Sequence, residues 1–139
     1  MASALLTLTL LLAGRPICSP VAGHLQPALP TVSYCELQKS PERFLNKSIR
    51  LRAIYVFGFE WQEFDSALCH SKRRTWVEMA DSVERCSTRA GKRWLQSSDD
   101  AGTLCLVVRG RLTGSNGGYG HLNGYDQLFE IDCVESRCV

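Results

Sequence analysis

The stretch IRLRAIYVF, residues 49–57, is followed by Gly58 and decides the fold of this chain. Every second residue, starting with the first, is apolar, which is the period of a β-strand with one buried face. The residues between them are two arginines and then Ile and Val, so the outer face is expected to be exposed to solvent at one end and buried at the other. Gly58 permits a sharp bend or bulge, and the alternation resumes in FEWQEF, residues 59–64. A strand that bends through a glycine into a second strand predicts the corner of a small barrel.

Further strands are predicted on both sides of this bend. Residues 32–35 could begin one strand, and residues 76–79 form a short apolar one. Residues 104–112 and 127–134 alternate in the same way as the first stretch. The residues expected on one face are Leu104, Leu106, Val108, Gly110 and Leu112 in the former, and Phe129, Ile131 and Cys133 in the latter.

The segments between the strands are predicted to contain little regular structure. Ser40 followed by Pro41 is a helix-start signal, which predicts one short helix. Residues 80–102 are polar and basic, which predicts a long loop with a helical turn around 81–86. Residues 113–124 contain five glycines, which indicates a loop. The fold predicted is therefore mainly β, a small five-stranded OB-like barrel with one short helix, because the usual seven strands of a sandwich do not fit.

The first residues have the composition of a targeting segment. The chain has 139 residues, enough for one domain, and residues 2–13 are apolar and uncharged. This run is too short to span a bilayer and matches the apolar core of a signal peptide, although no basic residue precedes it. We expect a signal peptide over 1–23, a Pro-containing linker over 24–31 and the barrel over 32–139. The alternative is an ordinary N-terminal strand or helix.

The cysteine count supports an oxidising compartment. The chain has seven cysteines, and Cys18 lies in the predicted signal peptide. The remaining even number predicts three disulfides and a secreted or extracytoplasmic protein, in the periplasm or cell envelope. The cysteines concerned are Cys35, Cys69, Cys86, Cys105, Cys133 and Cys138. Zinc ligands usually have closer spacing, so no metal is expected. Fifteen pairings are open for six cysteines, and Cys35–Cys69 is favoured because both would flank the first corner of the barrel.

The charge is a weak guide to a partner. Removing residues 1–23 takes away one arginine, which leaves 15 basic and 14 acidic residues and a net charge of +1. A near-neutral chain makes a nucleic-acid partner unlikely. After removal of the signal peptide, no stretch is long and apolar enough for a transmembrane helix.

Several short motifs are similar to a known family. They are CEL at 35–37, PERF at 41–44 with NK at 46–47, GFEW at 58–61, VRGRL at 108–112 and GYGHLNGY at 118–125. Together they resemble a family of uncharacterised, mostly bacterial secreted or lipoprotein domains with an OB-like fold. The resemblance covers residues 33–134. It implies a fold and a compartment, and it implies no activity.

The Gly-rich segment is the candidate ligand site. It brings Tyr119, His121, Asn123 and Tyr125 onto or beside one loop, which in an OB-like barrel can lie at the mouth where ligands bind. In the alternative interpretation the glycines only fold the connection, and His121 holds it by hydrogen bonds to the backbone. The other aromatic residues are expected in the core, as is usual in a small barrel.

No catalytic group or cofactor is expected from the spacing of the residues. The candidate carboxylates are Glu60, Glu63, Glu78, Glu130 and Asp132, and none is marked out beyond strand alternation. The arginines at 50, 52, 109 and 111 are typical of a solvent-facing strand surface, although a nuclease could use them. Asn46 begins a glycosylation sequon, which matters only in a eukaryotic secretory pathway.

The leading hypothesis is a secreted, non-enzymatic binding module for an unknown protein or small-molecule ligand. The first alternative is a hydrolase or nuclease with an OB-like fold. The second alternative is a structural component of the cell envelope.

Overall fold

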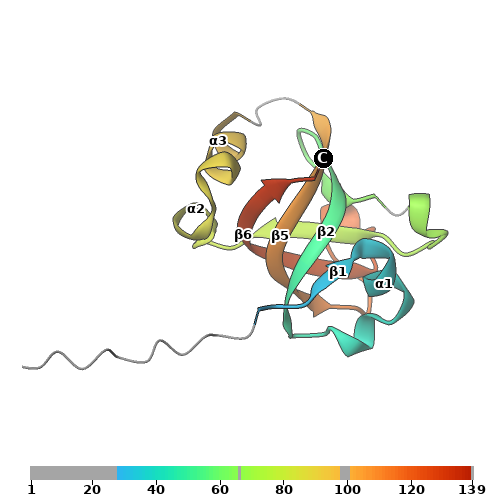
Figure 1. Ribbon diagram of the computed structural model, residues 1–139. Helices are drawn as coiled ribbons and strands as arrows, with labels where there is room; N and C mark the ends of the chain where they lie inside the picture. The colour runs from blue at the N-terminus through green and yellow to red at the C-terminus, as the bar shows by residue number, and fades with distance from the viewer. Residues whose placement is uncertain (1–27, 66, 98–100, 139) are drawn as a thin grey trace, which may run out of the picture.

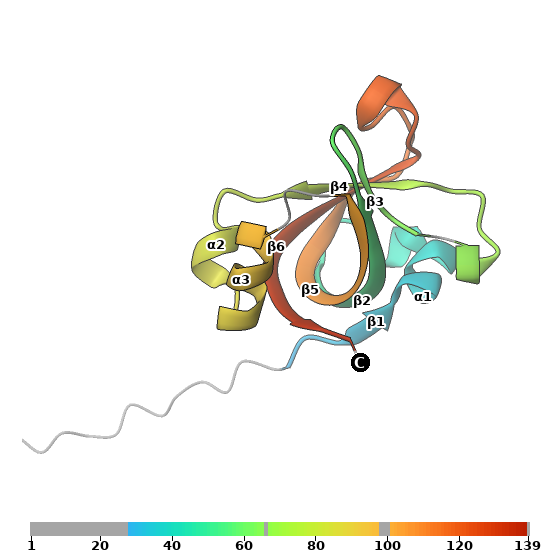
Figure 2. The same ribbon diagram turned by 90° about the horizontal axis from the view of Figure 1, so that it is seen from above.

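A computed structural model describes residues 28–65, 67–97 and 101–138. The predicted signal peptide and the first part of the predicted linker lie outside the described residues. The chain forms a closed barrel of five strands, with a short sixth strand alongside (Figures 1 and 2). The strands are β1 (Thr31–Ser33), β2 (Ser48–Phe57), β3 (Gln62–Phe64), β4 (Thr75–Met79), β5 (Gly102–Gly114) and β6 (Gln127–Arg137). The predicted five-stranded, mainly β barrel is confirmed.

The strands close the barrel in the order β2-β3-β4-β6-β5, with β5 pairing back onto β2. The pairs are antiparallel except β4 with β6, which is parallel. The added strand β1 lies parallel to β2 on its outside edge, with Val32 opposite Leu51. Consecutive strands are therefore not always neighbours in the barrel. The connection from β4 to β5 passes β6, which lies between them.

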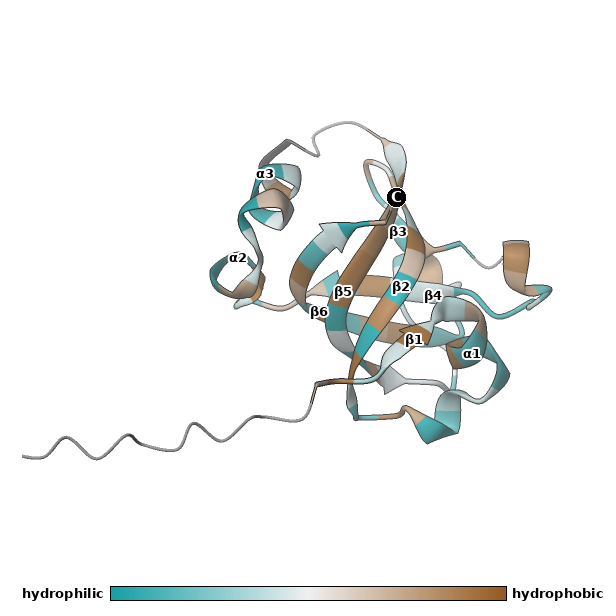
Figure 3. Cartoon of the chain, in the orientation of Figure 1, coloured by the Kyte–Doolittle hydropathy of each residue, from teal (hydrophilic) through white to brown (hydrophobic). Residues whose placement is uncertain are grey.

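The alternation in β2 and β5 arises because one face of each strand is buried, as predicted. Ile49, Leu51, Ala53 and Tyr55 are buried, whereas the arginines between them are exposed. The alternating bands along β2 are visible in Figure 3. In β5, the buried side chains of Leu106, Val108 and Leu112 face the same core from the neighbouring strand. Gly110 shares this face, and a Cβ there would lie 2.1 Å from the carbonyl oxygen of Glu130. Only glycine therefore lets β5 and β6 approach this closely.

Gly58 does not form the predicted corner within a strand. The chain reverses there into an antiparallel hairpin, in which Tyr55 lies opposite Phe64. The Gly58 amide donates to the carbonyl oxygen of Trp61 at 2.8 Å, and a Cβ on Gly58 would lie 2.5 Å from the indole Nε1 of Trp61. The glycine is needed because the tryptophan ring folds back over the turn.

The pairing between β5 and β6 is irregular, and it changes which residues of β6 face the core. The register shifts at three places along the pair. One shift leaves Asp132 as an extra residue between Ile131, which pairs with Gly110, and Cys133, which pairs with Arg109. Phe129 and Ile131 face the core as predicted, whereas Cys133 is turned to the outer side of the barrel, where it bonds to Cys86. A bulge of this kind is invisible to a strict two-residue period.

More helix is present than the sequence predicted. The first helix, α1 (Tyr34–Lys39), begins where the strand over 32–35 was expected to continue. Its start is a capping box, in which the Ser33 hydroxyl accepts from the Glu36 amide and the Glu36 carboxylate accepts from the Ser33 amide. The helix predicted after Ser40 is only one 3-10 turn, Pro41–Arg43, and the Ser40 side chain does not cap it. The stronger start signal, at Ser33, lies seven residues before the predicted one at Ser40.

The predicted loop over 80–102 contains two helices outside the barrel, beside β6 (Figure 1). They are α2 (Val83–Cys86), at the predicted helical turn, and α3 (Arg89–Ser97), which the sequence analysis missed. Trp94 is 6% exposed and lies edge-on to Tyr55, and Leu95 also packs against the core, so two apolar side chains hold α3. Gly91 lets the helix approach β6, because a Cβ there would lie 2.4 Å from the carbonyl oxygen of Val134.

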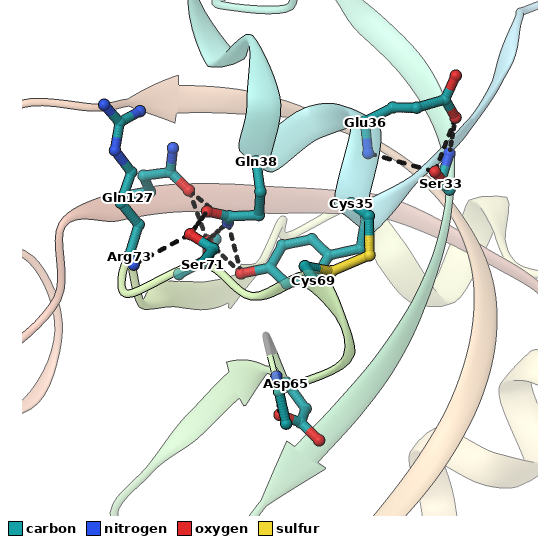
Figure 4. The surroundings of a disulfide bond; sticks show 12 residues. Ser33, Cys35, Glu36, Gln38, Asp65, Cys69, Ser71, Arg73 and Gln127 are labelled. Carbon is teal, nitrogen blue, oxygen red and sulfur yellow. Dashed lines mark hydrogen bonds between the residues drawn. A yellow bond between two sulfur atoms is a disulfide. The ribbon is translucent and has the colours of Figure 1, made fainter.

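Three disulfides join the described cysteines, as predicted: Cys35–Cys69, Cys86–Cys133 and Cys105–Cys138. The favoured pair, Cys35–Cys69, is confirmed, and it joins α1 to the 3-10 turn Ala67–Cys69 (Figure 4). Over the described ranges, no helix has the length and apolar character needed to cross a membrane.

A buried polar network lies beside the first disulfide. The Tyr34 hydroxyl donates to Thr75 Oγ1 at 2.7 Å, and Thr75 Oγ1 donates to Gln127 Oε1 at 2.8 Å. The Gln38 amide group donates to Gln127 Oε1 at 2.7 Å, and Ser71 donates to Gln38 Oε1 at 2.9 Å (Figure 4). These bonds tie α1 to β4 and β6 and pair the polar atoms of the network, apart from Gln127 Nε2, which is buried and has no hydrogen-bond partner among the described residues. An unpaired buried group of this kind is costly.

The buried tyrosines predict a loss of stability in alkali. Burial raises the pKa of both the Tyr34 and the Tyr55 phenol well above its ordinary value of 10.0. The unfolded chain then releases these protons above about pH 10 while the folded chain keeps them, so stability is complete below that pH and falls as the pH rises further. Chemical denaturation at about pH 9 and about pH 11 should show this loss. Tyr55→Phe should reduce it, and Tyr119→Phe in a partly exposed loop is the control. An equal loss in Tyr55→Phe and the parent would contradict the assignment.

Candidate functional site

An open cleft lies at one end of the barrel, between the turn at 58–61 and the Gly-rich loop. Both segments project on the same side of the barrel when it is seen from above (Figure 2). The cleft has a volume of about 470 Å³. Its lining, which we call the aromatic cleft, consists of Trp61, Glu63, Arg74, His121, Leu122, Gly124 and Tyr125. The site is thus built from three segments that are far apart in the sequence.

Arg74 is the central residue of the aromatic cleft. Its guanidinium donates to both carboxylate oxygens of Glu63, at 3.1 and 3.2 Å, and to the Tyr125 hydroxyl at 3.0 Å. It also lies over the Tyr125 ring, with 4.3 Å from its carbon to the ring centroid. The hydrogen bond to Glu63 raises the pKa of Arg74, and burial raises the pKa of the Tyr125 phenol. The floor of the cleft therefore carries a fixed ion pair beside a neutral phenol.

Backbone contacts place the Gly-rich loop against β4. The Arg74 amide donates to the Asp126 carboxylate at 2.8 Å, and the Arg74 carbonyl accepts from the Asp126 amide at 3.0 Å. Tyr119 and Tyr125 form an isolated antiparallel bridge that closes the loop. Gly120 has a φ of 63°, and a Cβ there would lie 2.4 Å from the Trp76 ring. The loop thus stacks its backbone on an indole, which any side chain at 120 would prevent.

Two of the four predicted ligand residues line the cleft, His121 and Tyr125. Tyr119 packs against Gly114 instead, and its hydroxyl bonds to the Asn116 side chain. Asn123 is exposed, has a φ of 55° and does not line the cleft. The structure therefore brings half of the predicted set together, and the other half supports the loop's own conformation.

The other five lining residues of the aromatic cleft were not predicted as ligand residues. Glu63 was named only as one of five candidate carboxylates, Arg74 belongs to the basic run KRR at 72–74, and Trp61 was expected in the core. The available signal was the position of Trp61, three residues after Gly58 in a turn. Only the strand order of the barrel places this turn opposite the Gly-rich loop. That order is not local information, so the pairing of Glu63 with Arg74 could not be predicted.

The expectation that the aromatic residues are core residues is wrong at this end of the barrel. Phe59 is 99% exposed and Trp61 39% exposed on the hairpin turn, and Leu122 is 86% exposed on the facing loop. By contrast, Tyr55 is buried and Phe57 packs against the core. Exposed apolar side chains gathered on neighbouring loops are typical of an interaction surface.

The charged residues of the aromatic cleft are already paired. Glu63 is held by Arg74 in a bidentate ion pair, so it is not free to act as a general base beside His121. The described ranges contain no group of three or more His, Cys, Asp or Glu side chains that could hold a metal ion. Recognition by shape, aromatic contact and hydrogen bonds is the chemistry that this arrangement supports.

Comparison with protein-family models, characterised proteins and solved structures finds no match to this chain.

Proposed function

We propose that this domain is an extracytoplasmic OB-type binding module that takes a protein or peptide ligand in the aromatic cleft. The observation that carries the proposal is the shared site of Trp61, Arg74 and Tyr125, flanked by the exposed apolar side chains of Phe59 and Leu122. Trp, Tyr and Arg are the residues most enriched among those that dominate binding energy at protein interfaces.

The position of the cleft supports the OB-type assignment. If the five barrel strands are counted in chain order, the cleft is formed by the loop between the first and second, the loop between the fourth and fifth, strand β3, and Arg74 directly before β4. These are the segments with which OB-fold barrels hold their ligands. The resemblance of the sequence motifs to secreted OB-like domains agrees with this interpretation.

The disulfides support the extracytoplasmic part of the proposal. Three bridges over a single small barrel are typical of proteins that fold in an oxidising compartment. The apolar run at 2–13 has the composition of a secretion signal.

A peptide ligand is favoured over a charged small molecule. Arg74 and Glu63 neutralise one another, so the cleft offers no net charge to an ionic ligand. The exposed apolar area of Phe59 and Leu122 extends beyond the cleft itself, which fits a partner with an extended surface. An apolar anchor side chain would enter between Trp61 and Leu122, and the Arg74 guanidinium would face the backbone carbonyls of the ligand.

Selection of linear peptides from a displayed random library against the purified domain tests the proposal. We expect enrichment of peptides with an aromatic or aliphatic anchor, and loss of their affinity by about tenfold or more in Trp61→Ala and Arg74→Ala. The matched controls are Leu68→Ala, an exposed apolar residue away from the cleft, and Arg73→Ala, the neighbouring basic residue. Peptides that bind the cleft variants as tightly as the parent would rule out the aromatic cleft as the binding site.

A further inference from the structure

The disulfide between Cys86 and Cys133 differs from the other two in exposure. Cys86 is an exposed residue at the end of α2, whereas its partner Cys133 on β6 is 2% exposed. The cysteines of the other two bridges are all of intermediate burial. One sulfur of this bridge is therefore open to attack from solvent and the other is enclosed by the protein.

A guanidinium is in contact with both sulfur atoms of this bridge. Arg109 Nη2 lies 2.7 Å from Cys86 Sγ and 2.8 Å from Cys133 Sγ. The bulge at Asp132 creates this contact, because it places Cys133 directly opposite Arg109 in the sheet register. No sulfur of the other two bridges accepts a hydrogen bond from an arginine among the contacts of the described residues.

The positive charge of Arg109 is not used by a carboxylate. Two other arginines on this face of the barrel form ion pairs, Arg50 with Glu135 at 2.5 Å and Arg111 with Asp132 at 3.1 Å. For Arg109, no carboxylate among the described residues lies within ion-pair distance. Its charge therefore remains available to a thiolate formed at either sulfur, since cations favour the thiolate over the thiol.

The bridge opens onto a groove that a reaction partner could enter. Cys86 and Arg109 line an open groove of about 810 Å³ on the outer face of β2, β5 and β6. Access to the sulfur and a stabilised leaving thiolate are the two properties that make a disulfide exchange readily.

We propose that Cys86–Cys133 is a thiol–disulfide exchange site that accepts two electrons from a dithiol reductant. One thiolate of the dithiol attacks the exposed Cys86 Sγ, and a bond forms between these two sulfurs. The bond between Cys86 Sγ and Cys133 Sγ breaks, and its electron pair stays on Cys133 as a thiolate beside Arg109. The second thiolate of the dithiol then attacks the reductant sulfur that is bonded to Cys86. This breaks the mixed disulfide and releases Cys86 as a thiolate. The dithiol leaves as a disulfide, and the protons it has lost are taken up as Cys86 and Cys133 become thiols.

The fold can survive this reaction, because other contacts hold α2 to β6. The Ser87 hydroxyl accepts from the Val134 amide at 2.9 Å, and the Thr88 amide donates to the Val134 carbonyl at 3.1 Å. Thr88 Oγ1 also donates to the Glu135 carbonyl at 2.7 Å, and Val83 is buried. Reduction of this one bridge would loosen the exposed end of α2 and leave the barrel closed.

Limited reduction of the folded domain with dithiothreitol, followed by thiol alkylation and peptide mass mapping over time, tests the proposal. We expect Cys86 and Cys133 to become labelled about tenfold or more before the other four cysteines, while circular dichroism keeps its folded signal. Arg109→Gln should slow their labelling by about tenfold, and Arg109→Lys should restore part of the rate. Arg73→Gln, at an exposed arginine that lines neither the groove nor the pocket beside the other two bridges, is the matched control.

The Arg109→Gln variant distinguishes an exchange site that depends on Arg109 from a disulfide that is reduced only because it is accessible. Equal labelling rates for the three bridges would overturn the proposal. Preferential labelling that Arg109→Gln leaves unchanged would overturn it as well, because exposure alone would then explain the rate. Circular dichroism of each variant before reduction confirms that the comparison is made between folded proteins.

Discussion

Phe129→Ala should destabilise the domain by about 3–5 kcal/mol, the cost of removing a buried aromatic ring from a packed core. Phe129 is fully buried in the barrel, and its ring lies edge-on to Phe64, with 5.4 Å between the centroids. A Cβ on Gly110 would lie 2.7 Å from the same ring, so the ring packs directly on the backbone of β5. Guanidinium denaturation of the oxidised protein measures this loss as a lower midpoint.

Leu128→Ala is the matched control for that prediction. Leu128 is the preceding residue of the same strand, is only half-buried and is not part of the core cluster. We expect its effect to stay below about 1.5 kcal/mol, because less apolar surface leaves the protein interior. Equal destabilisation by the two substitutions would show that the core does not lie on the Phe129 face of β6.

Complete reduction of the three disulfides should unfold the domain at 25 °C. The bridges join residues 34, 47 and 33 positions apart, and closing loops of this length restricts the unfolded chain by about 4 kcal/mol each. A domain typically has only about 5–15 kcal/mol of net stability, so the combined loss of about 12 kcal/mol is as large as the whole net stability expected of a small barrel. Circular dichroism of the fully reduced and alkylated protein should show no cooperative melting transition.

Alkylation without reductant is the control for this experiment. The oxidised domain, comprising residues 24–139, should take up no alkylating reagent under denaturing conditions, because all six described cysteines are paired. A cooperative transition in the fully alkylated protein would mean that the packed core suffices without the bridges. Uptake of two or more reagent molecules without reductant would mean that the bridges do not form in the protein as isolated.

The barrel class was predictable because the information for it is local. The alternation in residues 49–57 and 104–112 results from the geometry of a single extended strand, and burial of one face follows from it at once. The even number of cysteines after residue 23 predicted three bridges, and the pair Cys35–Cys69 was right. The Gly-rich loop was recognised by composition, and two of its four named residues line the cleft.

The predictions that failed depended on partners distant in sequence. α3 has a polar, basic sequence that resembles a loop, and it is held by Trp94 in contact with Tyr55, which lies on another element. Gly58 was compatible with either a bend or a reversal, and the pairing of β3 with β2 selected the reversal. Local propensity is a weak guide in such places, because tertiary packing overrides it.

The sequence by itself determined a mainly β barrel, its approximate strands, three disulfides and a Gly-rich loop. Only the tertiary structure decided that Glu63, Arg74 and Tyr125 meet in one cleft, and that Phe59 and Trp61 are exposed beside it. It also decided, through the bulge at Asp132, that Arg109 faces the Cys86–Cys133 bridge. The physical reason is the same in each case: side-chain alternation is set within one strand, whereas register and strand order are set by the packing of the whole barrel.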